Sequence, residues 1–220
     1  MIVKTFCTPP IENNNYVLID EETKDAALID CSSPIIWEKI TGNSVDRFNI
    51  STSFAGENRE EINGVKLKYI LLTHGHFDHI GGIKTGNNIP VFIHKADLDL
   101  VKDVNTYMPM MGLPAIDVPK IDRIIENEEI IKLGNKEIKV IHTPGHTQGG
   151  VCYYTEGILF SGDTIFRESV GRCDLPGGNF EQLADSIKNK IFTLPDNTKI
   201  YPGHGKSTTV GWEKEHNFFM

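Results

Sequence analysis

Short hydrophobic runs separated by polar turns occupy the first part of the chain, a pattern typical of β-strands. The runs at 2–6, 16–20 and 26–30 are predicted strands, and the polar segment 21–25 is predicted to be the hairpin turn between the last two. A short helix is predicted over 34–40. Farther along, the hydrophobic run 65–72 is predicted to be a strand that ends directly before His74.

The second part of the chain repeats the alternation of strands and helices. A strand at 91–93 and a helical stretch at 96–101 are followed by an apolar segment, Tyr107 to Pro114, which we expect to be an irregular loop and either a packed element or an adaptable lip. Further strands are predicted at 129–133, 137–141, 151–154 and 158–160. Asn179 can cap a helix whose apolar residues recur with the helical period, with Gln182 placed for a capping-box contact.

These elements predict one layered α/β domain over 1–220, because many strands with interspersed helices are joined without a repeat or a linker. The chain is 220 residues long and 39% hydrophobic, which is ordinary for a globular protein. Its net charge of -8 argues against nucleic acid or an anionic membrane as the main partner. The sequence does not predict an oligomeric state.

The sequence also supports expectations about the cellular location of the protein and the state of its cysteines. No apolar run approaches the roughly 18 residues that span a bilayer, and residues 1–12 do not form a signal h-region. We therefore expect a soluble, cytoplasmic protein. The cysteines are far apart and form no CxxC pair, so we expect reduced thiols and no thiolate metal site; they are Cys7, Cys31, Cys152 and Cys173.

Histidines and aspartates in glycine-bearing loops are the main chemical signal of the sequence. In the densest stretch, His74, His76, Asp78 and His79 fall within six positions. Imidazole nitrogen and carboxylate oxygen are ligands that suit zinc or iron. In an extended segment, positions i and i+2 can face one ion while the following residues face a second. The remaining ligands are expected from later loops, at His146, Asp163 and His204.

The pattern HxHxDH, H, D, H resembles that of the metallo-β-lactamase superfamily, and within it the chain is most similar to the glyoxalase II-like hydrolases. Supporting stretches include Asn15-Tyr16, Ile29-Asp30, residues 162–166, residues 171–174 and Asn217. The resemblance implies a four-layer αββα sandwich with metals at one edge between two sheets. It assigns His74, His76 and His146 to a first metal and Asp78, His79 and His204 to a second, with Asp163 bridging.

The resemblance therefore implies a binuclear hydrolase with two divalent ions. Zinc is the first expectation, and iron and manganese are alternatives. A water held by such ions loses a proton near neutral pH and becomes a nucleophile, and Asp78 is the side chain expected to take part in proton transfer. The positive site favours a small anionic substrate. A thiolate leaves without an added acid, which favours thioester cleavage. The resemblance implies a small thioester of the S-lactoyl-thiol, or hydroxyacylglutathione, type.

Two alternative functions remain open from the sequence. One is a mononuclear iron persulfide dioxygenase of the same fold, and the other is a non-catalytic metal-binding or sensing protein. Only a short segment follows His204, whereas glyoxalase II enzymes continue into a helical glutathione-binding domain. We therefore expect no such domain and transfer none of its contacts.

Several residues near the ligand loops have weaker assignments. Arg167, Arg172 and Lys206 are candidates for gripping a carboxylate of the substrate, with pairing to nearby acids as the alternative. Asp30 and Asp174 are expected to be buried residues that brace the site. The histidines outside the ligand set have structural expectations: His142 supports a loop, His94 makes a cap or loop contact, and His216 has no expected partner.

Overall fold

The computed structural model describes residues 1–220 except 10, 35, 37–63, 85 and 87. Most of the helix predicted over 34–40 therefore lies outside the described residues. The first part of the chain forms a six-stranded sheet in the order β1-β2-β3-β4-β5-β6. Its strands are β1 (Ile2–Thr8), β2 (Asn13–Ile19), β3 (Asp25–Ile29), β4 (Lys66–Leu71), β5 (Val91–His94) and β6 (Arg123–Ile125). The pairs β1–β2 and β2–β3 are antiparallel, and the rest of this sheet is parallel.

The second part forms another six-stranded sheet, in the order β14-β13-β10-β9-β8-β7. Its strands are β7 (Ile130–Leu133), β8 (Lys136–His142), β9 (Val151–Thr155), β10 (Ile158–Gly162), β13 (Lys199–Pro202) and β14 (Thr208–Thr209). All neighbours in this sheet are antiparallel except β10 and β13. A small antiparallel pair, β11 (Ile165–Phe166) with β12 (Ser169–Val170), stands beside it.

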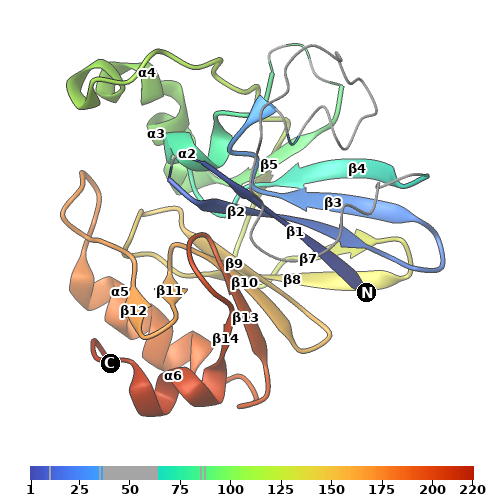
Figure 1. The fold of residues 1–220 in the computed structure, drawn as a ribbon, viewed down its shortest axis with the longest axis vertical. Helices are drawn as coiled ribbons and strands as arrows, with labels where there is room; N and C mark the ends of the chain where they lie inside the picture. The colour runs from blue at the N-terminus through green and yellow to red at the C-terminus, as the bar shows by residue number, and fades with distance from the viewer. Residues whose placement is uncertain (10, 35, 37–63, 85, 87) are drawn as a thin grey trace.

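Short helices flank the two sheets (Figure 1). Those that follow strands of the first sheet are α2 (Phe77–Ile80), η1 (Lys95–Asp97), α3 (Leu98–Lys102), α4 (Val104–Tyr107) and η2 (Pro109–Met111). Those on the side of the second sheet are α5 (Phe180–Ser186), the π-helical turn η3 (Ile187–Ile191) and α6 (Val210–His216). Asn179 caps α5 by accepting a 3.0 Å hydrogen bond from the Gln182 amide.

The side chains of each strand alternate between two hydrophobic clusters, which makes the fold four layers deep. In β2, Tyr16 and Leu18 pack between the sheets, where they share a cluster with Val140 and Tyr153. Val17 and Ile19 point the other way, to the cluster under α3 and α4. A third cluster lies beneath α5, η3 and α6. Because apolar residues fill both faces of each sheet, helices cover the outer faces, as the predicted αββα sandwich requires.

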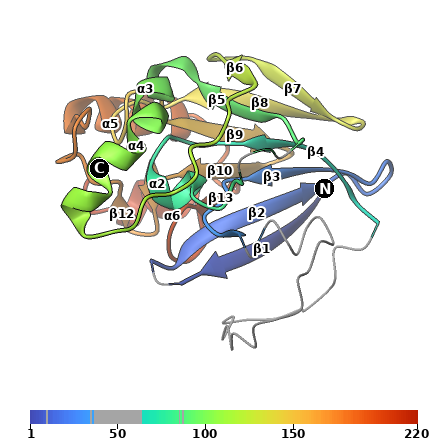
Figure 2. The ribbon, with the colours of Figure 1, turned by 90° about the horizontal axis from the view of Figure 1, so that it is seen from above.

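The strand ends that matter for chemistry meet at one edge of the sandwich. Figures 1 and 2 show the helices α3, α4 and α5 gathered on one side and the turns of the β2–β3 and β7–β8 hairpins on the other. The loops that follow β4, β8, β10 and β13 open on the helical side and carry the predicted ligands. The fold therefore brings together residues that are far apart in the sequence.

The predicted strands and turns agree with the structure apart from their ends. β2 begins at Asn13, three residues before its predicted start, and the predicted helix at 96–101 is a turn of 3-10 helix followed by α3. The segment Tyr107 to Pro114 is not wholly irregular, because it contains the end of α4 and the turn η2. Gln182 does not complete the capping box, since its side-chain oxygen accepts from Gln148.

Candidate metal centre

The first donor group consists of His74, His76 and His146. The chain leaves β4 at Leu71 and reaches α2 at Phe77, with the extended His76 at the helix N-cap. The three histidines each offer a ring nitrogen, and these atoms lie within 4.8 Å of one another. His76 Nδ1 and His146 Nε2 are 2.9 Å apart. Three imidazoles from two distant loops thus converge on one point.

The second donor group consists of Asp78, His79 and His204, whose donor atoms also lie within 4.8 Å of one another. His204 Nε2 is 3.3 Å from Asp78 Oδ2, and His79 Nε2 is 3.7 Å from the same oxygen. Asp78 and His79 are adjacent on the single turn of α2, whereas His204 follows β13. A second point of convergence therefore lies beside the first.

Asp163 stands between the two groups. Its Oδ1 is 3.4 Å from His79 Nε2, and its Oδ2 is 3.6 Å from His146 Nε2 and equally 3.6 Å from His204 Nε2. One carboxylate thus faces donors of both groups. The structure brings all seven sequence-predicted donor residues into one cluster.

The chemistry of this cluster fits bound cations. His74 is 2% exposed, and its Nε2 has no hydrogen-bond partner among the described residues. A buried polar atom of this kind calls for a partner. Gly203 leaves the necessary space, because a Cβ atom there would come within 2.2 Å of Asp163 Oδ1 and 2.8 Å of His79 Cε1. Imidazole and carboxylate donors without thiolates suit divalent zinc, iron or manganese.

Asp30 makes hydrogen bonds to the segment that carries His74 and His79. Its Oδ1 accepts from the Thr73 amide, and its Oδ2 accepts from the Thr73 hydroxyl, both at 2.8 Å. The same Oδ2 is 2.8 Å from His79 Nδ1. Asp30 has a left-handed backbone, with φ of 58°, which is uncommon for a residue other than glycine. The expectation that Asp30 braces the site is confirmed.

Backbone carbonyls orient two further histidines. His146 Nδ1 lies 2.7 Å from the carbonyl oxygen of Arg172, and His204 Nδ1 lies 3.2 Å from that of Ile11. A carbonyl can only accept, so each Nδ1 donates a hydrogen bond and each Nε2 is the nitrogen that faces the cluster. This arrangement fixes the imidazole tautomer in the way that metal-binding histidines require.

Sequence reasoning missed Asp97, which connects two of the ligand loops. Its carboxylate is buried and accepts from the amide of Gly75, the hydroxyl of Thr147 and the amide of Gly149. Gly75 lies between His74 and His76, and Thr147 follows His146. The sequence offered no signal for this role, because a lone aspartate before a helical stretch is common at helix starts.

Asn13 was also missed, although it lies inside the second donor group. Its Nδ2 is 3.1 Å from His79 Nε2 and 3.5 Å from Asp78 Oδ2. Asn13 forms an isolated antiparallel bridge with His204, so β2 and the last ligand loop are in contact. The run of three asparagines at the start of β2 was the available signal, but its polarity is equally typical of a turn.

Burial and mutual charge set the protonation of the cluster. Burial lowers the pKa of His74 far below its ordinary value and that of His76 to about 4, and neighbouring imidazoles act in the same direction. Burial raises the pKa of Asp78 and of Asp163, but the histidines, His79 first, more than offset it and hold both pKa values below the ordinary value. Neutral imidazoles and ionised carboxylates are the forms that bind metals.

The pKa of His79 is shifted in the opposite direction from that of His74. Burial by itself lowers its pKa, but Asp163, Asp30 and Asp78 more than offset this effect, so its pKa lies well above the ordinary value. Without a cation at the centre, His79 therefore keeps a proton that partly neutralises the surrounding carboxylates. Binding of a metal there must release that proton.

The cluster opens into a cavity of about 760 Å³. The donors that line it are His76, Asp78, His146, Asp163 and His204. The rest of the lining is mainly apolar and comes from α3, α4 and the segments around β11 and β12. A substrate that enters the cavity reaches the candidate centre directly.

The proposed substrate-gripping residues occupy three different places. Arg172 lines the cavity, but its guanidinium makes two hydrogen bonds to Asp174, at 2.7 and 2.8 Å. Arg167 lies over the ring of Trp212, 5.0 Å from its centroid, and is not among the described residues that line the cavity. Lys206 is exposed and is likewise outside that lining. Asp174 is exposed, so the expectation that it is a buried brace is wrong.

The histidines outside the cluster have structural contacts. His94 and His142 stack with ring centroids 4.1 Å apart. His94 caps η1 by accepting from the Ala96 amide, and His142 Nε2 lies 2.9 Å from the carbonyl oxygen of Gln148. These contacts confirm the structural expectation for both residues. The expectation for His216 is wrong, because His216 stacks on Trp212 at 4.0 Å.

Two further observations bear on class and compartment. Within the described parts of the chain, no helix is both long and apolar enough to cross a membrane. The four cysteines are free, and Cys31 and Cys152 are buried.

Known proteins resemble this chain in sequence and in structure. Over 213 residues the chain is 34% identical to the hydroxyacylglutathione hydrolase GloC of Haemophilus influenzae, an alignment that covers 94% of this chain and 92% of that protein. The crystal structure of the BLEG-1 B3 metallo-beta-lactamase is 34% identical, with a TM-score of 0.80 and coverage of 99% of each chain. That of TTHA1623 in a di-iron-bound form is 31% identical, with a TM-score of 0.78 and coverage of 99% of this chain and 100% of that one.

A family model described as the metallo-beta-lactamase superfamily matches residues 10–204, a range that contains all seven donor residues. The match covers most of the chain. The chain therefore belongs to the metallo-beta-lactamase superfamily and is a metal-dependent hydrolase of that superfamily.

Proposed function

We propose that the protein hydrolyses small thioesters at a centre for two divalent metal ions. The observation that carries the proposal is the position of Asp163, which faces two adjacent donor groups at the wall of an open cavity. His74, His76 and His146 would hold one ion, and Asp78, His79 and His204 the other, with Asp163 between them. Bound divalent ions polarise a carbonyl and lower the pKa of water to near neutrality.

The side chains around the cavity favour a leaving group that needs no acid. The aspartates and histidines that line it all belong to the donor set, and the phenol of Tyr107 is at the exposed rim. An amine must be protonated as it leaves, whereas a thiol has a pKa near 8.5 and leaves as a thiolate. Thioester hydrolysis is therefore the reaction that this set of groups supports best.

The reaction uses one water for each thioester. The water oxygen forms a bond to the carbonyl carbon, the carbon–sulfur bond breaks, and the sulfur leaves with the bonding electron pair as a thiolate. Asp78 is ionised at neutral pH, because its pKa lies below the ordinary value. Its carboxylate can therefore accept the proton that the water loses. Transfer of that proton from Asp78 to the thiolate restores the carboxylate and completes the two products, a carboxylic acid and a thiol.

The similarity to GloC of Haemophilus influenzae supports a thioester of the hydroxyacylglutathione type as the first substrate to test. The two adjacent donor groups argue against the persulfide dioxygenase alternative, since a mononuclear reaction needs only one of them. They also argue against a non-catalytic structural site, because a structural ion needs neither a second donor group nor an open cavity.

The test is elemental analysis of protein purified without oxygen, followed by assays with each restored metal. We expect two ions per chain, with zinc first and iron or manganese as alternatives, and cleavage of S-lactoylglutathione without oxygen uptake. The Asp78→Asn variant is expected to lose at least about 100-fold in kcat/KM, and His216→Asn on the exposed face of α6 is its control. Hydrolysis of a β-lactam alone, or oxygen uptake with a persulfide, would overturn the proposal.

A further inference from the structure

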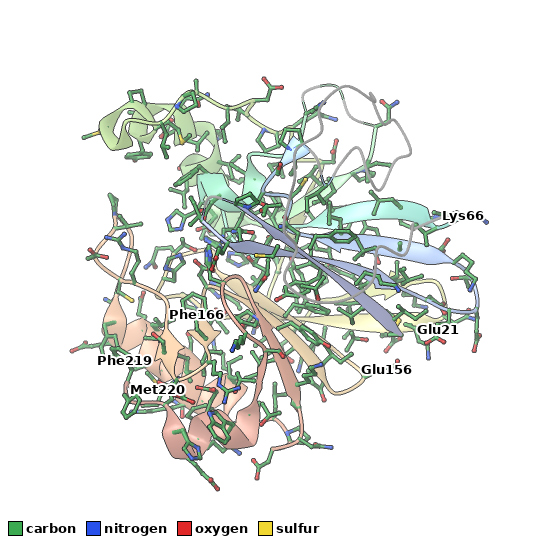
Figure 3. All side chains as sticks on the ribbon, in the orientation of Figure 1. Glu21, Lys66, Glu156, Phe166, Phe219 and Met220 are labelled. Carbon is green, nitrogen blue, oxygen red and sulfur yellow. The ribbon has the colours of Figure 1, made fainter. Side chains whose placement is uncertain are left out.

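The cavity beside the candidate centre has an apolar wall that the proposed chemistry does not use. Val104, Tyr107 and Met110 form one side of it, and Phe166, Val170 and Leu175 belong to another. Phe166, labelled in Figure 3, comes from the strand β11 that follows the Asp163 loop. Binding two ions, a water and a carbonyl group requires the donor residues of this cavity. It does not require the apolar side chains.

Apolar side chains also remain exposed at the mouth of the cavity. Met110 is 82% exposed and Tyr107 is 37% exposed, and Ile11, whose carbonyl oxygen contacts His204, is 45% exposed. Large apolar side chains that line a cavity and reach solvent are typical of a surface that binds an apolar ligand. Their position places that ligand within reach of the reacting carbonyl.

The charged groups of the cavity do not provide for a strongly anionic ligand. Among the described residues that line it, Arg172 is the only lysine or arginine. Both hydrogen bonds of its guanidinium go to Asp174, so its charge is already matched. A thiol carrier with several carboxylates would find ions near the carbonyl but no free arginine or lysine along this wall.

We propose that the substrate carries an unbranched hydrocarbon chain of several carbons, which lies along this apolar wall while the thioester carbonyl faces the candidate centre. The inference rests on the proposed function and names the class of thioester. The chain can belong to the acyl group or to the thiol, since both flank the carbonyl. Burial of one methylene group increases binding by about threefold to fourfold.

Two substrate series distinguish the side on which the chain lies. In the acyl series, N-acetylcysteamine thioesters run from acetyl through butanoyl to hexanoyl. In the thiol series, the acetyl group is constant and the thiol runs from ethanethiol to hexanethiol. The metal-loaded protein is expected to show kcat/KM that rises at least about tenfold along one series. S-Lactoylglutathione is the polar comparison, and we expect it to be a poorer substrate than the best hexyl compound.

A charged substitution at the mouth of the cavity tests whether the apolar wall binds the hydrocarbon chain. Met110→Glu changes an exposed side chain, so the fold should be retained, but it places a carboxylate beside the hydrocarbon chain. We expect it to lower kcat/KM for the best hexyl substrate at least about fivefold and to lower kcat/KM for the acetyl thioester of N-acetylcysteamine by a clearly smaller factor. Phe218→Glu is the matched control, because Phe218 is 86% exposed and is not among the described residues that line the cavity.

Binding to the metal-free protein gives a readout that does not depend on hydrolysis. N-Ethylhexanamide and N-hexylacetamide are amide analogues of the two series, and calorimetry compares each with N-ethylacetamide. Tighter binding of one hexyl analogue, weakened by Met110→Glu, supports the inference even if no thioester is cleaved and the proposed function fails. Cleavage of short thioesters with no gain along either series, or equal binding of all three amides, overturns the inference and leaves the proposed function intact.

Discussion

The hydroxyl of Thr147 donates a 2.8 Å hydrogen bond to the buried carboxylate of Asp97, fifty residues earlier in the chain. The same oxygen of Asp97 accepts from the amide of Gly75 at 2.9 Å. Gly75 lies between two donor histidines and Thr147 follows a third, so one carboxylate joins the two loops that carry the first donor group. Asp97 is therefore a positioning residue.

Asp97→Asn is predicted to weaken both the fold and the candidate centre. The carboxylate uses both oxygens as acceptors, and an amide can replace only one of them. One buried donor is then left without a partner, which costs about 1 to 3 kcal/mol of unfolding free energy. Metal affinity should fall about 10-fold to 100-fold, as for other residues that orient metal ligands. Denaturant unfolding and competition with a metal indicator measure the two effects.

Asp99→Asn is the matched control for this change. Asp99 is exposed on the same helical segment, where it pairs with Lys102 at 3.2 Å. Exposed pairs of this kind contribute about 0 to 1 kcal/mol. Equal metal affinity of the Asp97 and Asp99 variants would show that Asp97 does not position the ligands.

His204→Ala is predicted to reduce the metal content from two ions per chain to one. His204 belongs to the second donor group, whereas the three imidazoles of the first group are left in place. The remaining ion should still bind, and thioester hydrolysis should fall at least about 100-fold, because residues that act as a unit lose most of their effect together. Elemental analysis and steady-state kinetics provide the measurement. Two ions retained in this variant would remove His204 from the ligand set.

Chelation is predicted to lower the thermal midpoint of unfolding. The donor atoms converge only in the folded chain, so the metal binds the native state and stabilises it by mass action. At a free metal concentration of 100 times Kd, the stabilisation is about 2.7 kcal/mol per ion. Calorimetric scans with and without chelator test this, and restored metal is the control for reversal. An unchanged midpoint would mean that the cluster holds no tightly bound ion.

Arg172→Ala is predicted to change KM for anionic thioesters by less than about threefold. The guanidinium is exposed and is paired with Asp174, and this pair lowers the pKa of Asp174 to about 2. A guanidinium that is already paired and solvated contributes little binding free energy to a further ion pair with a substrate. The contact to His146 comes from the backbone carbonyl of Arg172 and survives the substitution. A tenfold rise in KM would instead show that the Arg172 side chain binds the substrate.

The donor set could be predicted from the sequence because each donor residue lies in a glycine-bearing segment that follows a hydrophobic strand. The hydrophobic run before His74 indicates where that strand ends, and such strand ends meet at one edge of a sheet. His79 and Asp163 were identifiable for the same reason, although their mutual distance was not.

The supporting residues could not be predicted, because their roles depend on contacts between distant segments. Asp97 is the last residue of η1, in the first half of the fold, and accepts from two residues of the loop after β8. Nothing in its local sequence differs from an ordinary cap. The exposure of Asp174 has the same origin, since only the folded loop shows whether its carboxylate faces solvent or the protein.

The last prediction concerns acid stability and the stacked pair His94 and His142. Burial, with His142 as the next cause, lowers the pKa of His94 from 6.5 to about 4 in the folded protein. Between those two values the unfolded chain binds a proton that the folded chain does not. The free energy of unfolding therefore falls as pH decreases from about 6.5 to about 4, and the stabilisation is complete above pH 6.5.

His94→Asn is predicted to remove this part of the pH dependence. Asparagine keeps an acceptor at the cap of η1, where His94 now accepts from the Ala96 amide, but it does not titrate. Denaturant unfolding at pH 7.5, 6 and 5 with chelator present compares the two proteins without metal release. The variant is expected to be less stable at pH 7.5, because it loses the ring stacking, and the difference should narrow as the pH falls. Parallel curves would show that His94 keeps an ordinary pKa in the folded chain.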